Sequence, residues 1–473
     1  MARYDYDITI IGGGSGGLTA ARLAQSLGAR VALVDKERLG GDCLHYGCVP
    51  SKSLIHVAKV AQQARQAAQI GLGAADLAVD MAKVAQYIQG VIGRVELAEH
   101  VYTKGVDVRL GVFRFLSQHD CAVDGASFSS RSFVIASGSR PVVPQIDGLA
   151  ETGFLTNEQA FDLLHLPPSL VVVGGGPIGV ELAQAFARLG THVTLVHGPE
   201  RLLPKEDPDV SQAVAEALAR DGVEIVTGAR VQQVRREGAE KVVEAQRGGE
   251  PVTLRASEIL IALGRMPNVD ALNLPAAGVE YSDKGIAVDG YLQTSARNMS
   301  AIGDVIGGYL FSHVAAYHAG IAVRNLLVPI GKKQVNYDVL PWVTFTDPEA
   351  ARIGLTEAQA MQRQPVRVVR FPWREIDRAQ AEAEPEGFIK LVLSAKSDEI
   401  LGAHLVGAHA GELLGEIALA MKYKLGLNAI FSTTHAYPTY TTGLQQAAFE
   451  AYLASQSLQN VRNILRPVLS LRG

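Results

Sequence analysis

The sequence predicts an α/β protein in which one structural unit occurs twice. Each copy has a short β-branched strand, a glycine-rich turn, an alanine- and leucine-rich helix and a second strand. This order is typical of folds that bind dinucleotides. A close pair of cysteines follows the first copy. With 473 residues, the chain has room for about three domains.

The first copy begins with a strand at Ile8–Ile11, and its glycine turn follows at residues 12–17. A helix is predicted over Leu18–Leu27 and the second strand over Arg30–Val34. The key positions are Gly12, Gly14, Gly17 and Asp35. The three glycines allow a tight turn, approach of the backbone to a pyrophosphate, and close packing of helix on strand, while the acid accepts a ribose hydroxyl.

The second copy has a strand at 170–173, a glycine turn, a helix that ends at Leu189 and a strand at 192–196. Its glycines with the same three roles are Gly174, Gly176 and Gly179. His197 stands where the acid is expected. Arg201 and Lys205 lie just beyond and suit the extra phosphate of NADP, although solvated surface charges have the same pattern. NADPH is favoured here and NADH stays open.

Cys43 and Cys48 have four residues between them, and Cys121 is the only other cysteine. Stapling so short a loop removes little chain entropy, so the pair is predicted to be a disulfide that opens and closes as chemistry, or a metal site. Five residues of regular helix rise roughly 7.5 Å, and a disulfide needs its Cα atoms within about 7 Å. A bridge therefore requires an irregular turn, which Gly47 permits.

The bulk composition excludes some partners. A net charge of −4 gives no reason to expect nucleic acid or an anionic membrane. No apolar stretch reaches the roughly 20 residues of a membrane span, and Met1–Asp7 does not form a signal peptide. We expect a cytoplasmic protein, in which such a cysteine pair is catalytic or redox-sensing.

Two dinucleotide sites around one cysteine pair predict an electron relay. A nicotinamide delivers hydride, a flavin receives it, and the disulfide accepts the electron pair. Further segments extend the pattern: residues 40–52, 136–141, 262–268, 301–304, 345–349 and 402–416. With these motifs the chain resembles the flavin-dependent pyridine nucleotide–disulfide oxidoreductases, which include dihydrolipoamide dehydrogenase, glutathione reductase and mercuric reductase.

That resemblance implies two Rossmann-like domains and an α+β dimerisation domain. The FAD-binding domain would consist of residues 1–147 and 269–335, with the NAD(P)-binding domain at 148–268 between them. Residues 336–473 would form the C-terminal interface domain of a homodimer. The resemblance implies FAD and either NADPH or NADH as cofactors, and it implies no metal as a resident cofactor.

The resemblance also implies roles for single residues. Cys48 would be the sulfur on the flavin side, and Cys43 the interchange sulfur that meets the substrate. Lys52 would sit near the reactive nitrogen of the flavin, paired with Glu181. Asp304 would bind the ribityl chain of the flavin. The remaining cofactor contacts would come from Gly41, Gly138, Gly264 and Gly303.

The chain departs from this family near its C-terminus. Relatives that reduce organic disulfides carry His-Pro-Thr-x-x-Glu there, and the partner subunit supplies it as the acid–base pair. Here Tyr437 stands at the histidine position and Thr442 at the glutamate position, while His435 lies two residues earlier. Either His435 takes over the role, or Tyr437 donates the proton to a disulfide substrate, or the acceptor is a soft metal ion that needs no base.

The sequence therefore predicts a homodimeric NAD(P)H-dependent FAD oxidoreductase with a redox-active Cys43–Cys48 disulfide, active in cell redox homeostasis. Its predicted substrate is a small disulfide, as in dihydrolipoamide dehydrogenase. A thiophilic metal ion, as in mercuric reductase, is the first alternative, although the C-terminal cysteine pair of that enzyme is missing here. A flavoprotein redox sensor without rapid turnover is the second.

Overall fold

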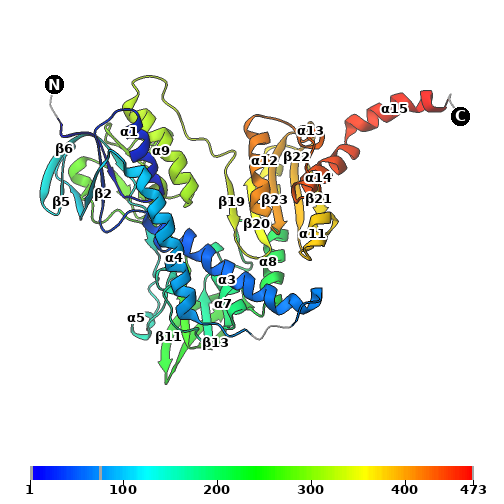
Figure 1. Cartoon of the computed structure of the whole chain (residues 1–473), viewed down its shortest axis with the longest axis horizontal. Coiled ribbons are helices and arrows are strands. Elements are labelled where there is room, and N and C mark those ends of the chain that lie inside the picture. The colour runs from blue at the N-terminus through cyan, green and yellow to red at the C-terminus, as the bar shows by residue number, and fades with distance from the viewer. Residues whose placement is uncertain (1–3, 74–76, 471–473) are drawn as a thin grey trace. The chain divides into compact units, whose positions relative to one another are not determined.

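The computed structural model describes residues 4–73 and 77–470 (Figure 1). The chain divides into two compact units. The first consists of Met1–Gly174, Ala185–Thr194 and Val231–Val335. The second consists of Gly175–Gln184, Leu195–Arg230 and Asn336–Gly473. None of the described helices is long and apolar enough to cross a membrane.

The first predicted nucleotide fold is present as β1 (Tyr6–Ile11), α1 (Ser15–Ser26) and β2 (Val31–Asp35). Strand β1 pairs in parallel with β2 and with β6 (Ala126–Ile135). The seven-stranded sheet has the order β3-β2-β1-β6-β5-β4, and β18 pairs with β6. The other strands are β3 (Asp107–Leu110), β4 (Phe113–Phe115), β5 (Asp120–Val123) and β18 (Met299–Ala301).

Both faces of this sheet are covered, as expected for parallel strands. Ile8 and Ile10 of β1 are fully buried in a cluster with residues of α1 and of α9 (Ser312–Leu327). A second cluster contains Phe115, Phe133 and Cys121. Cys121 is fully buried, as its apolar strand context predicts.

The second predicted nucleotide fold contains β8 (Ser169–Val173), α7 (Pro177–Leu189) and β9 (His192–Val196). Its four-stranded sheet has the order β10-β9-β8-β14, and β8 pairs in parallel with β14. A three-stranded sheet has the order β11-β12-β13. These further strands are β10 (Glu224–Val226), β11 (Ala229–Glu237), β12 (Glu240–Arg247), β13 (Glu250–Ala256) and β14 (Glu258–Ile261).

Two of the motif segments, residues 136–141 and 262–268, lie side by side in the first unit. Strand β7 (Ser139–Pro141) pairs antiparallel with β15 (Arg265–Pro267). The other elements of this unit are α2 (Gly41–His45), α3 (Cys48–Gln66), α4 (Met81–Glu99), α5 (Leu149–Thr152), α6 (Asn157–Ala160), β16 (Tyr281–Ser282) and β17 (Gly285–Ile286).

The second unit is built on a five-stranded antiparallel sheet with the order β19-β20-β23-β22-β21. Its core surrounds the fully buried Trp373 and includes Ile417 and Leu444 from two helices. The strands are β19 (Pro341–Thr344), β20 (Glu349–Gly354), β21 (Val366–Pro372), β22 (Phe388–Ser394) and β23 (Ile400–Gly407). The helices are α8 (Pro208–Arg220), α10 (Glu357–Arg363), α11 (Asp377–Ala381), α12 (Ala410–Lys422), α13 (Leu427–Ser432), α14 (Thr441–Leu453) and α15 (Gln456–Ser470).

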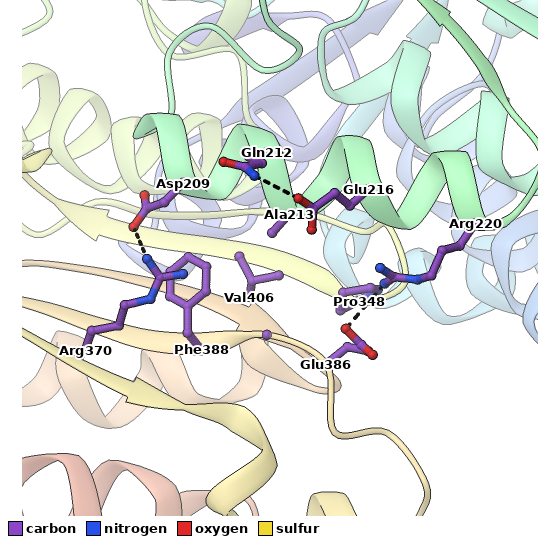
Figure 2. Close-up of a pocket in the computed structure, with 11 residues that line it drawn as sticks. Asp209, Gln212, Ala213, Glu216, Arg220, Pro348, Arg370, Glu386, Phe388 and Val406 are labelled. Carbon is purple, nitrogen blue, oxygen red and sulfur yellow. Dashed lines mark hydrogen bonds and ion pairs between the residues drawn. The ribbon is translucent and has the colours of Figure 1, made fainter.

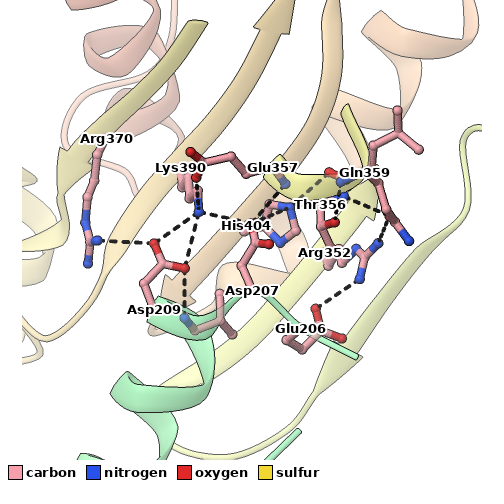
Figure 3. Close-up of polar contacts among 12 residues, drawn as sticks. Glu206, Asp207, Asp209, Arg352, Thr356, Glu357, Gln359, Arg370, Lys390 and His404 are labelled. Carbon is pink, nitrogen blue, oxygen red and sulfur yellow. Dashed lines mark hydrogen bonds and ion pairs between the residues drawn. The ribbon is translucent and has the colours of Figure 1, made fainter. Parts of the chain in front are cut away.

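A buried group of charged side chains fixes the start of α8 to this sheet (Figure 3). The Lys390 ammonium lies 3.0 Å from Asp207, 3.3 Å from Asp209 and 2.9 Å from Glu357. His404 on β23 is fully buried beside Asp207. Burial lowers the pKa of His404 to about 4, so its ring is neutral at pH 7.

A shallow pocket of about 250 Å³ lies where α8 faces the same sheet (Figure 2). Asp209 pairs with Arg370 at 3.2 Å, and Arg220 pairs with Glu386 at 3.6 Å. Arg370 also lies over the ring of Phe388. Since these charged side chains are already paired with one another, we interpret the pocket as a feature of the packing of α8 on the sheet and not as a ligand site.

Candidate active site

The first glycine turn has a backbone that side chains would obstruct. Gly12 has a φ of +105°, and a Cβ there would lie 2.3 Å from the carbonyl oxygen of Ala136. A Cβ on Gly17 would lie 1.8 Å from the carbonyl oxygen of Gly12. Gly14 is the N-cap of α1. The turn therefore brings unobstructed backbone to a helix N-terminus, which is the environment that a pyrophosphate needs.

Asp35 closes this turn at the end of β2. One of its carboxylate oxygens accepts the N–H of Gly13 at 2.7 Å, and the other accepts the N–H of Glu37 at 3.1 Å. These bonds fix the carboxylate at the edge of the turn, where the ribose of a dinucleotide is expected. The residues present thus fit the adenosine half of FAD.

The segment that carries the cysteines packs directly on the same turn. Gly41 has a φ of +59°, and a Cβ there would lie 2.7 Å from the Cα atom of Gly14. Gly40 donates its N–H to the carbonyl of Gly13 at 2.9 Å. Gly41 therefore serves the close approach of two backbones, and it ties the cysteine segment to the predicted FAD site.

The cysteine pair lies at a break between two helices. Cys43 belongs to α2, which ends at His45, and Cys48 begins α3. Tyr46 and Gly47 interrupt the helix, and a Cβ on Gly47 would lie 3.0 Å from the carbonyl oxygen of Asp42. The irregular turn predicted from the length of a disulfide is thus present. No disulfide bond joins Cys43 and Cys48 in this structure, so the pair is in its reduced form.

The two sulfurs have different electrostatic surroundings. A hydrogen bond to Cys48 raises the pKa of Cys43 well above its ordinary value, and burial raises it further. Cys48 lies at the N-terminus of α3, and its Sγ is 3.5 Å from the hydroxyl of Ser312, the first residue of α9. Helix N-termini stabilise negative charge. In the reduced pair, the negative charge is therefore favoured on Cys48 and the proton on Cys43.

A chain of polar side chains connects the cysteine segment with the second FAD motif. Arg265 lies 2.9 Å from Asp42 and donates to the hydroxyl of Ser139 at 2.8 Å. Ser139 in turn donates to Asp304 at 2.6 Å. Burial raises the pKa of Asp304, against the opposing effects of Ser139 and Arg265.

Ser139 and Arg265 lie within the motif segments 136–141 and 262–268, but no role was predicted for either residue. The two residues lie in short strands, β7 and β15, that pair with each other, and this pairing is not visible in either segment of the sequence. Gly138, Gly264 and Gly303, predicted as cofactor contacts, have φ values of +70°, +109° and +69°. Each supplies a left-handed backbone beside this polar chain.

His45 and Tyr46, which lie between the cysteines, have structural partners. His45 is buried, and its Nε2 lies 2.7 Å from the carbonyl oxygen of Leu39. The Tyr46 hydroxyl accepts a bond from Arg38 at 2.9 Å. These contacts hold the segment in place and indicate a packing role for both side chains.

The second glycine turn is built like the first, with a histidine in place of the acid. Gly174 has a φ of +123°, and a Cβ there would lie 2.3 Å from the carbonyl oxygen of Ala262. Gly175 donates its N–H to Nδ1 of His197 at 3.0 Å, as Gly13 donates to Asp35. Since Nδ1 accepts, a neutral ring carries its hydrogen on Nε2. Burial lowers the pKa of His197, which keeps the ring neutral.

Arg201 is engaged locally, which weakens its predicted role as a phosphate contact. Its guanidinium donates to the carbonyl oxygens of Pro204 at 3.0 Å and Glu206 at 2.8 Å. Lys205 is exposed and stays available for a phosphate. His197 and Lys205 are therefore the residues that we expect to decide between NADH and NADPH.

We expect His197→Asp to lower the ratio of kcat/KM for NADPH to that for NADH at least about tenfold. A carboxylate accepts the same Gly175 N–H but repels the 2′-phosphate, and juxtaposed like charges cost several kcal/mol. Steady-state oxidation of both cofactors measures the ratio. His192→Asp, an identical change at an exposed position of β9, is the control. Equal ratios in both variants would remove His197 from cofactor selection.

Two predicted site residues lie in different units. Lys52 is on α3 in the first unit, and Glu181 is on α7 in the second. Glu181 is buried, and its carboxylate accepts the N–H of Phe345 at 2.8 Å. The pairing of Lys52 with Glu181 stays a prediction.

The C-terminal candidates for an acid–base role are both held by neighbours in the second unit. His435 has Nδ1 2.9 Å from the carbonyl oxygen of Thr433 and Nε2 2.9 Å from the carboxylate of Glu416. Tyr437 is 74% exposed and donates its hydroxyl to Asp377 at 3.0 Å. That bond raises the pKa of Tyr437, so the phenol keeps its proton. Both ring nitrogens of His435 and the hydroxyl of Tyr437 are thus engaged by groups of their own unit.

Comparison with known proteins shows that the chain is similar to one family of enzymes over most of its length. Residues 6–320 match the pyridine nucleotide-disulphide oxidoreductase family, and residues 340–448 match its dimerisation domain. A mercuric reductase of Bacillus cereus is 36% identical over 94% of this chain and 71% of its own length. A dihydrolipoyl dehydrogenase of Bacillus subtilis is 33% identical over 94% of this chain and 98% of its own.

Solved structures of the same shape come from Escherichia coli. The HOCl-induced flavoprotein disulfide reductase RclA matches 93% of this chain and 99% of its own, with a TM-score of 0.85 and 28% identity. A Cu(II) complex of RclA matches 93% of this chain and 98% of its own, with a TM-score of 0.84 and 28% identity.

Proposed function

Because the chain belongs to the pyridine nucleotide-disulphide oxidoreductase family, which uses FAD and NAD(P)H, we propose that it reduces thiophilic metal ions through Cys43 and Cys48. When bound, FAD would accept a hydride from the nicotinamide and pass the electron pair to the cysteines. The residues that would hold it are the first glycine turn, Asp35 and Asp304. Cys48 lies on the flavin side of the pair and Cys43 meets the acceptor. The dimerisation domain supports a homodimer.

One observation favours a metal ion over an organic disulfide as the electron acceptor. Two side chains could handle the proton of an interchange thiol. Both ring nitrogens of His435 are held, by Thr433 and by Glu416, and the Tyr437 hydroxyl is bonded to Asp377. Reduction of an organic disulfide gains roughly 10²–10⁴ in rate from a positioned acid or base. A soft metal ion needs none, because it binds sulfur directly and displaces the proton itself. Among the similar structures, RclA has a Cu(II) complex.

The electron balance of this reaction is simple. The two thiols of Cys43 and Cys48 give up two electrons and two protons and form one disulfide bond. Two Cu²⁺ ions accept one electron each and leave as Cu⁺, or one Hg²⁺ ion accepts both and leaves as the metal. With FAD bound, the hydride of NAD(P)H together with one proton from water would restore the two thiols, and NAD(P)⁺ would be released.

A small organic disulfide is the second candidate. It is favoured by the near full-length similarity to dihydrolipoyl dehydrogenases of Bacillus subtilis and Chlorobaculum tepidum. In this case the Tyr437 hydroxyl would donate the proton that a leaving thiolate needs. The candidate keeps Cys43 as the interchange sulfur.

Turnover of an acceptor panel tests the proposal. NADPH or NADH oxidation would be followed with Cu²⁺, Hg²⁺, lipoamide and glutathione disulfide. We expect the metal ions to be reduced at least about tenfold faster than either disulfide, as the missing base implies. Faster reduction of a disulfide would overturn the proposal. Slow oxidation with every acceptor, despite full flavin reduction, would favour a redox sensor.

Tyr437→Phe separates the two candidates further. The change keeps the ring and removes only the hydroxyl, which is exposed and bound to Asp377. Metal-ion reduction is expected to stay within about twofold, whereas disulfide reduction that depends on this proton donor would fall roughly tenfold or more. Tyr423→Phe, another exposed tyrosine of the same unit, is the control.

A further inference from the structure

The C-terminal helix α15 has an apolar face that is largely exposed in the single chain. Figure 1 shows α15 leading away from α14 and from the sheet of its unit. Exposed fractions are 44% for Val461, 71% for Ile464, 46% for Leu465 and 63% for Leu469. Four apolar residues, at 458, 461, 465 and 469, follow the spacing of three or four residues that places side chains on one side of a helix.

The opposite side of α15 is polar and basic. It carries Gln459, Arg462, Asn463 and Arg466, all exposed. No acidic residue occurs after Glu450. A helix of 15 residues is marginal in water on its own and gains most of its stability by packing an apolar face. The apolar side of α15 therefore needs a surface to cover it.

We infer that α15 packs its apolar face against the dimerisation domain of a second copy of this chain. The first reason is continuity. The family's dimerisation domain is matched over residues 340–448, and α15 follows the last helix of that domain, α14, after only two residues. Phe449 and Leu453, on α14, are 40% and 44% exposed and lead towards the same helix. The apolar surface thus extends from the dimerisation domain into α15.

The second reason is charge. The chain as a whole has a net charge of −4, whereas the described part of α15 carries two arginines and no acid. The dimerisation domain of a second copy, residues 340–448, has twelve Asp and Glu against ten Lys and Arg, so the domain proposed to receive the basic helix is net negative. Closed two-fold dimers use the same pair of surfaces twice, so both copies of α15 would be covered.

Photo-crosslinking of the full-length holoenzyme tests this contact. p-Benzoyl-phenylalanine would replace Ile464 on the apolar side or, as the matched control, its neighbour Asn463 on the polar side. Position 464 is expected to give a product of twice the 50.3 kDa chain mass on a denaturing gel, at least fivefold more than position 463. Leu465→Asn in the same protein should lower that yield at least fivefold, whereas Gln459→Asn, on the exposed polar side, should not.

The alternatives give different results. Equal yields from the two positions, or products of single-chain mass only, would overturn the inference. Flotation of the wild-type protein with vesicles of phosphatidylcholine and phosphatidylglycerol, without a crosslinked dimer, would assign the apolar face to a membrane surface instead and would also overturn it. Acceptor turnover need not change in any of these variants, so the outcome is independent of the proposed substrate.

Discussion

Cys43→Ser is expected to lower the turnover of every acceptor at least about a thousandfold, since loss of the reacting nucleophile removes the route itself. The variant should still bind its cofactors, because the glycine turns and Asp35 do not depend on the sulfur of Cys43. Reduction by NAD(P)H should proceed through the flavin and then stop. Rapid-mixing absorbance of the flavin, followed by steady-state assay with Cu²⁺ and lipoamide, measures both steps.

Cys121→Ala is the matched control for this prediction. Cys121 is fully buried in the cluster beside Phe115 and is not part of the helix break that carries the pair. Its loss should leave turnover within about twofold, apart from a modest loss of stability from the small cavity. Acceptor turnover that survived in Cys43→Ser would show that the electrons leave by another path.

The fold was predictable because its signal is local. Short β-branched strands next to glycine turns identify β1 and β8, and the observed bounds differ from the predicted ones by a few residues at most. The start of α1 was the larger error: the helix begins at Ser15, whereas Leu18 was predicted. Ser15 to Gly17 are weak helix formers, but a dinucleotide turn uses the free N–H groups of the first helical turn, so glycine is tolerated there.

The candidate site was predictable only where residues act at fixed spacing. Cys43, Cys48 and the glycine turns carry their chemistry in short motifs. The chain Asp42–Arg265–Ser139–Asp304 joins residues far apart in sequence, so no window of sequence contains it. His435 and Glu416 are likewise distant in sequence, and the sequence does not show that their contact occupies one ring nitrogen of the histidine. At His197 the pattern showed a missing acid, but only the structure shows that the ring accepts the same glycine N–H.

Lys390→Met is expected to destabilise the second unit by about 3–5 kcal/mol, the usual cost of leaving buried charge without its partner. Lys390 stands in an otherwise apolar strand, FIKLVLS, and its side chain is 6% exposed. Burial works to lower its pKa, but hydrogen bonds to Glu357 and Asp207 outweigh this and hold the pKa above the ordinary value. The lysine is thus charged in the folded protein.

Removal of this cation would strand Asp207, which is 3% exposed. Burial alone would raise the pKa of Asp207, yet the neighbouring His404 and Lys390 hold it below its ordinary value. Asp207 therefore contributes stability above its unfolded pKa of about 3.9, and this contribution is lost as the pH falls through the folded value. In Lys390→Met, much of that contribution would be absent already at pH 7.

Urea unfolding followed by circular dichroism measures the effect, with Lys396→Met, an exposed lysine of the same unit, as control. The double variant Lys390→Met with Asp207→Asn should be more stable than Lys390→Met alone, because it removes the stranded carboxylate together with the ammonium. If the double variant were instead less stable by the sum of the two single changes, the two side chains would not be coupled. Their loss would then be one of packing, and the charge group would not be what fixes α8 to the sheet.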